Sequence, residues 1–165
     1  NFNTANVEQM NYMFNFCSEL TSLDLSSFNT ANVIFMNDMF NSCSSLTSLD
    51  LSNFNTANVM SMDGMFNRCS ALTSLNVSSF NTEKVTSMAS MFSYCSNISE
   101  LDLINFDFRN VDVGYGFDGM FTNLGEYSDN LPPVIIYVKD ENDKIILKSA
   151  NTGIPDRVII SVKQP

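Results

Sequence analysis

The stretch CSSLTSLDLSNFNTANV, residues 43–59, decides the fold because the chain repeats it almost word for word. Residues 17–33 read CSELTSLDLSSFNTANV, and residues 69–85 read CSALTSLNVSSFNTEKV. Four residue types recur with a constant step of 26: Cys17, Cys43, Cys69 and Cys95; Phe2, Phe28, Phe54, Phe80 and Phe106; Val7, Val33, Val59, Val85 and Val111; Met10, Met36, Met62 and Met88. An ungapped period of this kind predicts stacked structural units of equal size.

Each unit contains two apolar patterns. The first, L-x-x-L-x-L, ends on apolar residues two positions apart, which is the spacing of a strand. The second, V-x-x-M-x-x-M-F, has spacings of three, six and seven, which fit one face of a short helix. The Asn and Thr residues between the two patterns can cap that helix or bind turn backbone. We therefore predict an α/β fold: a leucine-rich-repeat solenoid of 26-residue strand-turn-short-helix units, with a parallel sheet on its concave face.

The repeat weakens toward the C-terminus. In the fifth copy the Met-Phe pair slips to residues 120–121, and Leu124 takes the place of the cysteine. Leu131, Val134 and Ile136 form the last L-x-x-L-x-L pattern. We predict that the solenoid covers residues 1–138, about five repeats.

A C-terminal cap of residues 139–165 should follow the repeats. Asp140 can cap a helix that runs to about Ser149, with Asp143 three residues on, and residues 157–162 read as a final strand. Such a cap covers the core edge of the last unit. Since the chain opens inside a repeat, on NFNTANV, we expect it to be part of a longer protein with upstream repeats.

Charge and composition argue against several function classes. The net charge is −10, and no Lys or Arg precedes Arg68, so a nucleic-acid partner and an anionic membrane surface are not expected. The sequence has no His, no nucleophile motif and no phosphate-binding glycine loop, and we predict that the protein is not an enzyme and uses no cofactor. No apolar run approaches the roughly 20 residues of a transmembrane helix.

The repeat resembles a known family. Residues 7–30, 33–56 and 59–82 match N-V-x-x-M-x-x-M-F-x-x-C-x-x-L-x-x-L-D-L-S-x-F-x-T almost position by position. This phrase is similar to that of the BspA-like leucine-rich-repeat surface proteins of bacteria, in the branch with a 26-residue repeat and no assigned function. The resemblance covers roughly residues 1–138. It implies a bacterial protein, secreted or on the cell surface, used for adhesion or protein binding, without catalytic residues.

The four cysteines allow three interpretations. A zinc site needs four converging ligands, but equivalent residues of stacked units form a row about 4.8 Å apart, so the outer two would lie roughly 14 Å apart. Disulfides between neighbouring units would need closer Cβ atoms than parallel stacking provides. A buried ladder of free thiols suits a small apolar residue at a tight corner. We favour the ladder of Cys17, Cys43, Cys69 and Cys95 and expect no metal.

Polar residues between the apolar columns provide the candidate binding face. Stacking should place them in rows on the concave face: Thr21, Ser22 and Asp24; Thr47, Ser48 and Asp50; Thr73, Ser74 and Asn76; Ser99, Glu100 and Asp102. Stacked carboxylates would favour a Lys, an Arg or a calcium ion beside them. We predict a monomer that binds a host or neighbouring-cell surface or matrix protein bearing a basic patch.

Two other functions remain open at this stage. The protein could be a structural stalk that presents other domains, with acids that only keep an exposed sheet soluble, or a calcium- or glycan-binding repeat.

Several variable positions add further candidate surfaces. The place before each cysteine holds Phe16, Ser42, Arg68 or Tyr94, and Ile34, Phe35 and Met60 replace polar residues in the V-x-x-M-x-x-M-F pattern. Residues 112–130, with Tyr115, Phe117 and Tyr127, are either a binding protrusion or a packing adjustment near the cap.

Overall fold

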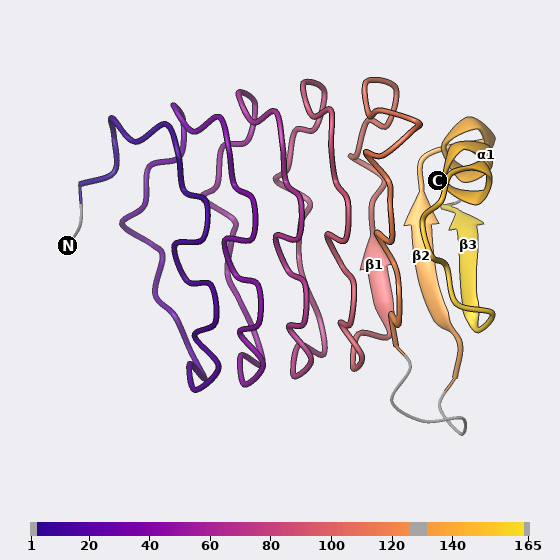
Figure 1. The fold of residues 1–165 in the computed structure, drawn as a ribbon, viewed down its shortest axis with the longest axis horizontal. Coiled ribbons are helices and arrows are strands. Elements are labelled where there is room, and N and C mark those ends of the chain that lie inside the picture. The colour runs from indigo at the N-terminus through magenta and orange to yellow at the C-terminus, as the bar shows by residue number, and fades with distance from the viewer. Residues whose placement is uncertain (1–2, 126–131, 164–165) are drawn as a thin grey trace.

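The computed structural model describes residues 3–125 and 132–163. The chain winds through successive turns that lie side by side along the long axis, from the N-terminus to a small sheet and a helix at the other end (Figure 1). We call each turn a coil. Backbone hydrogen bonds join neighbouring coils: the Met10 N–H donates to the Phe35 carbonyl at 2.9 Å, and the Met60 N–H donates to the Ile34 carbonyl at 2.8 Å. These partners are 25 or 26 residues apart, so one repeat makes one coil.

The regular elements are few in the described residues. Strands β1 (Glu100–Asp102), β2 (Val134–Val138) and β3 (Val158–Val162) form one parallel sheet in the order β1-β2-β3. The only helix described is α1 (Glu141–Ser149). Leu101 of β1 is in register with Ile136 of β2, which is in register with Ile160 of β3. All three are buried, so the sheet continues the apolar column of the repeat into the C-terminal segment.

The predicted strands of the first three L-x-x-L-x-L patterns do not form. Residues 20–25, 46–51 and 72–77 have no strand assignment, and no backbone hydrogen bonds join them from coil to coil. Side chains make the links at the ends of these segments instead: the Asn53 amide donates to the Leu25 carbonyl, and the Ser79 hydroxyl donates to the Leu51 carbonyl. The predicted parallel sheet is therefore present only in its C-terminal part, from β1 onward.

The short helix predicted for each V-x-x-M-x-x-M-F pattern is also wrong. Residues 36–43 form consecutive turns, in which the Met39 N–H donates to the Met36 carbonyl and the Cys43 N–H donates to the Phe40 carbonyl. Asp38 has φ of 54°, outside the helical range. Its N–H donates to the Asp63 carbonyl of the next coil, so the backbone makes bonds between coils where a helix would make them within itself. Isolated parallel bridges such as Phe35↔Ser61 belong to the same pattern.

The apolar columns are nevertheless buried as their spacing predicted. Phe40, Phe66, Phe92 and Phe121 stack in one file with ring centroids 5.8, 5.9 and 6.0 Å apart. The three-residue slip of the fifth copy is confirmed, because Phe121 takes the next place in this file. Leu124 is fully buried, and its N–H donates to the Phe121 carbonyl as that of Cys95 does to the Phe92 carbonyl.

The helix and strand predicted for the C-terminal segment are present. Asp140 caps α1 by accepting from the N–H groups of Asn142 (2.9 Å) and Asp143 (3.1 Å). Leu147 of α1 is buried in the common core, and β3 lies within the predicted residues 157–162. Leu131 and Tyr127 lie outside the described residues.

Candidate functional site

The twelve polar residues of the predicted binding face lie at the surface. All are exposed except Asp102, which is partly exposed, while Leu49 and Leu75 between them are buried. We call Asp24, Asp50, Asn76 and Asp102 the Asp column. Neighbouring members contribute to the same shallow depressions, one of about 160 Å³ lined by Asp24 and Asp50 and one of about 440 Å³ lined by Asn76 and Asp102.

Each member of the Asp column also has a local structural role. One side-chain oxygen of Asp24 accepts from the Ser26 N–H at 2.9 Å, and Asp50 accepts from the Ser52 N–H at 2.9 Å. The amide oxygen of Asn76 accepts from the Ser78 N–H at 3.0 Å. These are Asx-turns, in which Asp and Asn serve equally well. The turn explains why Asn can stand in the column.

The column is anionic, and its last member holds a cation. The Ser26 hydroxyl and N–H lower the pKa of Asp24, and hydrogen bonds from Ser52 lower that of Asp50. Both carboxylates therefore stay ionised well below neutral pH. Asp102 forms an ion pair with Lys163, whose ammonium group lies 5.5 Å from the centre of the Tyr137 ring. In the described part of the chain, Asp24 and Asp50 have no such partner.

The cysteines stand in file as free thiols. Cys43, Cys69 and Cys95 are buried, and Cys17 is partly exposed. The Sγ of each buried cysteine donates to a carbonyl of the preceding coil, as Cys69 does to Phe40 O at 3.1 Å. Burial raises the pKa of Cys43 to about 11 and of Cys95 to about 12, and it raises that of Cys69 as well. In residues 3–125 and 132–163, no cluster of three or more Cys, His, Asp or Glu is placed to hold a metal ion.

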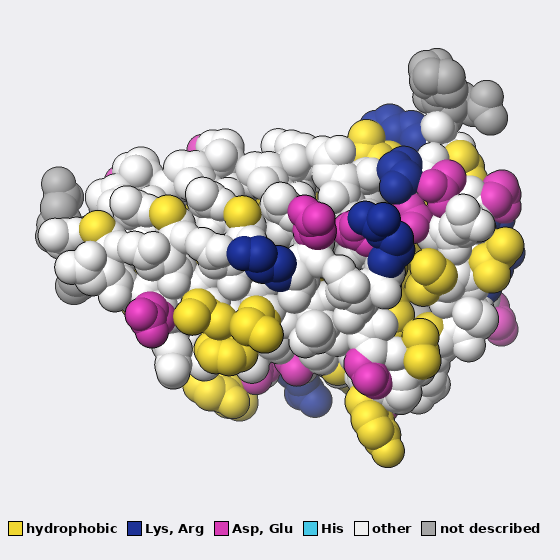
Figure 2. Space-filling model, turned by 90° about the horizontal axis from the view of Figure 1, so that it is seen from above, with side chains coloured by type: hydrophobic (Ala, Val, Ile, Leu, Met, Phe, Trp, Pro, Cys, Tyr) yellow, Lys and Arg dark blue, Asp and Glu magenta, His cyan; other side chains and the backbone are white. Residues whose placement is uncertain are grey.

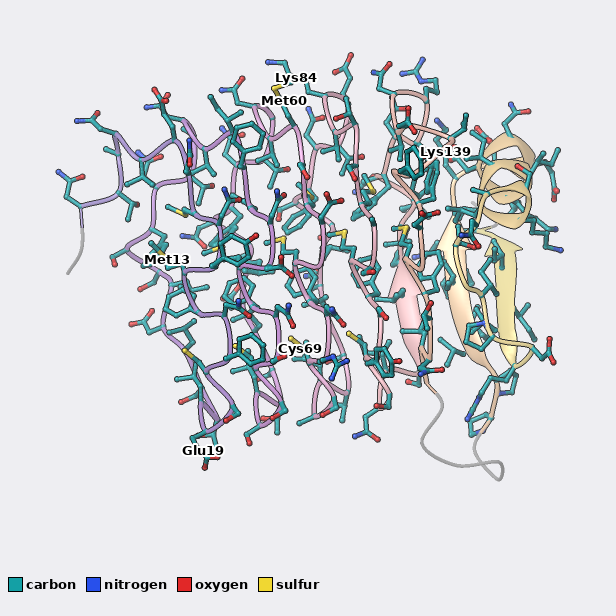
Figure 3. All side chains as sticks on the ribbon, in the orientation of Figure 1. Met13, Glu19, Met60, Cys69, Lys84 and Lys139 are labelled. Carbon is teal, nitrogen blue, oxygen red and sulfur yellow. The ribbon has the colours of Figure 1, made fainter. Side chains whose placement is uncertain are left out.

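A groove on another edge of the coils was predicted only in part, because Ile34 and Met60 were candidate surface residues and its other lining residues were not. It is lined by Asn6, Glu8, Asn32, Ile34, Asn58, Met60 and Lys84 and has a volume of about 510 Å³. Met60 and Lys84 project from the upper edge of the stack in Figure 3. Seen from above, hydrophobic side chains gather on this edge close to a basic and an acidic group (Figure 2). The sequence carried a signal, because Lys84 interrupts a column that otherwise reads Asn6, Asn32, Asn58 and Asn110.

The irregular segment after residue 111 divides into exposed and buried parts. Asp112 accepts from the N–H groups of Gly114 and Tyr115 and holds a tight loop. Val113 and Tyr115 on this loop are about 80% exposed (81% and 80%), whereas Phe117 is in the core. Within its described residues, the segment is thus both a protrusion and a packing adjustment.

The residues before the cysteines share a backbone conformation. Phe16, Ser42, Arg68 and Tyr94 all have φ between 58° and 61°. The Arg68 guanidinium lies over the Tyr94 ring, 4.9 Å from its centroid. Phe16, Arg68 and Tyr94 are exposed, whereas Ser42 is buried.

Comparison with known proteins identifies one family. The family model described as "Mycoplasma protein of unknown function, DUF285" matches residues 1–74 and residues 46–134. The two matches overlap and together cover residues 1–134. No curated protein and no solved structure matches the chain. Among the described residues, no helix has the length and hydropathy required to cross a bilayer.

Proposed function

The chain belongs to the family described as Mycoplasma protein of unknown function, DUF285, and from this premise we propose that it is a non-catalytic binding module. Its ligand is a basic surface of another protein, which docks on the Asp column and on the hydroxyl groups beside it. The ion pair between Lys163 and Asp102 carries the proposal. It places an ammonium group on one member of the column, and the partner would repeat this contact at Asp24 and Asp50.

The wider assignment follows from the repeat. We propose that the protein is a BspA-like leucine-rich-repeat solenoid, with the repeats over residues 1–138 and a cap over 139–165, and that it acts outside the cell on the bacterial surface or in secreted form. The 26-residue step and the hydrogen bonds between coils support the solenoid. The proposed location rests on the resemblance of the repeat to the BspA-like surface proteins. The V-x-x-M-x-x-M-F segments have no helices, and the first three L-x-x-L-x-L segments have no strands. In this proposal the unit is therefore a variant of the strand-turn-helix pattern.

The test uses variants that keep the Asx-turns. The double variant Asp24→Asn, Asp50→Asn removes two charges but retains the oxygens that accept from Ser26 and Ser52. A panel of purified cell-surface and matrix proteins is screened by surface plasmon resonance at low and at high salt. For a binder, two exposed ion pairs lost at up to about 1 kcal/mol each predict an affinity lower by up to about thirtyfold, together with a weaker salt dependence.

A matched control separates the column from net charge. Glu19→Gln with Glu83→Gln also removes two exposed acids, neither of which belongs to the column or lines the groove. It should leave the affinity within a factor of two to three, on the order of 0.5 kcal/mol. If a partner binds the Asp24, Asp50 variant as tightly as the wild type at every salt concentration, the column is not the binding surface.

The Asx-turns favour one rival function. Because the side chains of the column already have a local structural role, the repeats could serve as a stalk that presents other domains and binds nothing through this face. Shortening the protein by one repeat distinguishes the two. A stalk would lose function in proportion to the length that is removed. The Asp24→Asn, Asp50→Asn variant of a stalk would retain full function.

A further inference from the structure

The groove on the upper edge offers a second surface, on a different side of the coil from the Asp column. Two rows of surface residues border it. In each coil, one row holds the residue before the buried valine and the other holds the residue after it, as Asn32 and Ile34 do around Val33. One row is Asn6, Asn32, Asn58 and Lys84, and the other is Glu8, Ile34 and Met60. Thr86 continues the second row beyond the lining of the groove. We call this surface the asparagine groove.

The backbone holds the second row rigidly. The Ile34 N–H donates to the Glu8 carbonyl at 2.7 Å, the Met60 N–H donates to the Ile34 carbonyl, and the Thr86 N–H donates to the Met60 carbonyl, the last two at 2.8 Å. Neighbouring side chains are therefore about one strand spacing apart, roughly 4.8 Å. Ile34 is partly exposed and Met60 is 45% exposed. They place two adjacent apolar side chains on the floor of an open groove.

The amide row orients the polar groups. The Asn32 amide donates to the Ala5 carbonyl at 2.7 Å, and the Asn58 amide donates to the Ala31 carbonyl at 2.9 Å. Asn58 accepts from the Lys84 ammonium at 2.8 Å, whereas the Asn32 oxygen accepts no hydrogen bond in the described residues. A ligand beside Asn32 must supply an N–H or O–H donor. The N–H groups of an extended peptide meet this requirement.

The two ends of the groove carry opposite charges. Glu8 lies at the N-terminal end and Lys84 three coils further, which corresponds to roughly 14 Å. Neither forms an ion pair within residues 3–125 and 132–163. An extended peptide covers this distance in about four residues. Its ends must be charged in the opposite sense, with a base beside Glu8 and an acid beside Lys84.

We propose that the asparagine groove binds an extended segment of a partner protein that carries apolar side chains for Ile34 and Met60, a basic residue beside Glu8, and an acidic residue about four positions away beside Lys84. Met60 suits such a site because its flexible thioether adapts to different apolar side chains. The binding mode depends on fixed charges and a preformed floor, so it requires no movement of the coils. It does not depend on the Asp column.

A random peptide library displayed on phage tests the proposal with the whole chain as bait. The selected peptides should carry an apolar residue between a base and an acid about four positions apart. The charge exchange Glu8→Lys, Lys84→Glu keeps the net charge, and it should reverse the order of acid and base in the selected peptides. The exchange Glu19→Lys, Lys148→Glu is the matched control, since neither residue lines the groove, and it should leave the selected sequence unchanged.

The floor is tested separately with Met60→Asp, which should lower the affinity of a selected peptide more than tenfold while the circular dichroism spectrum stays unchanged. Tyr115→Asp, at an exposed residue of the loop after Asp112, is the control and should have no effect. The Asp24→Asn, Asp50→Asn variant should bind the peptide normally, so failure of the proposed function and failure of the groove can be told apart. No enrichment over the input library, or a selected sequence that ignores the charge exchange, would overturn the proposal. Self-association lost in Met60→Asp would also overturn it, because the occupant would then be a second copy of the chain.

Discussion

Replacing Thr56 with valine should destabilise the protein by about 2 kcal/mol, because this hydroxyl joins two coils. Thr56 is only 1% exposed. Its Oγ1 donates to the Asn81 carbonyl at 2.9 Å and accepts from the Asn81 N–H at 2.8 Å. Valine has nearly the same shape without the hydroxyl, so both backbone groups of Asn81 would lose their partner.

The magnitude follows from the cost of unpaired polar groups. A buried donor or acceptor left without a partner costs about 1–3 kcal/mol. Asn81 is a solvent-exposed residue, so the lower end of the range, about 1 kcal/mol, applies to each of the two groups. Thr56→Ser is the control, because it keeps the hydroxyl and loses one methyl group, worth about 0.8 kcal/mol.

Equilibrium unfolding in urea measures both variants against the wild type, with an unchanged m-value as the sign that the same surface unfolds. Hydrogen exchange at the Asn81 amide gives a local reading and should be faster in Thr56→Val than in Thr56→Ser. Thr30 and Thr82 make the same pair of bonds to Asn55 and Asp107, so their valine variants should behave alike. A valine variant as stable as the serine variant would refute the idea that these hydroxyls join the coils.

Three further predictions concern the core and the C-terminal helix. Cys43 and Cys95 should react slowly with a maleimide at pH 8 and quickly in denaturant, and rapid labelling of the folded protein would contradict their burial. Burial raises their pKa values to about 11 and about 12, whereas unfolded thiols ionise near 8.5. The free energy of unfolding should therefore fall as the pH rises above about 8.5. Asp143→Asn should raise the melting temperature at pH 7, because burial raises the pKa of this carboxyl above 3.8 and its charge lowers the stability of the folded protein at neutral pH. The gain in melting temperature should fade as the pH falls toward 3.8. A gain that does not depend on pH would count against buried charge as the cause. Gly64→Ala should cost about 1–3 kcal/mol in urea unfolding, because Gly64 has φ of +59° and an added Cβ would overlap the Asp38 carboxylate. Part of the loss should be recovered in an Asp38→Ser background. Full tolerance of alanine would show that the turn adjusts.

Much of the core could be read from the sequence. When units of equal length stack, the neighbours of a residue are the residues 26 positions away, so each column of the repeat becomes a file in space. The Phe file from Phe40 to Phe92 was predictable for this reason. Phe121 and Leu124 lie 29 residues after Phe92 and Cys95, and they were predictable from the Met-Phe pair that marks the slipped fifth copy. The C-terminal helix was predictable because an Asp cap is a local signal, satisfied by the next three residues.

The secondary structure of the unit was not predictable in the same way. Spacings of three, six and seven fit a helix, but consecutive turns bury the same Met and Phe residues. The choice between them depends on where the backbone N–H of residues such as Asp38 finds its acceptor, and that acceptor is Asp63 O in the next coil. Thr56 and Asn32, which look like local turn or cap residues in the sequence, likewise bind backbone in a neighbouring coil.

The sequence by itself determined the length of the unit, the residues that face inward and the uneven charge, because these depend only on position along a periodic chain. The tertiary structure decided the backbone path within each coil and the placement of Glu8, Ile34, Met60 and Lys84 in one groove. These features depend on hydrogen bonds and contacts between coils. Their partners are 24 to 29 residues apart, and no local pattern specifies the register at which two coils meet.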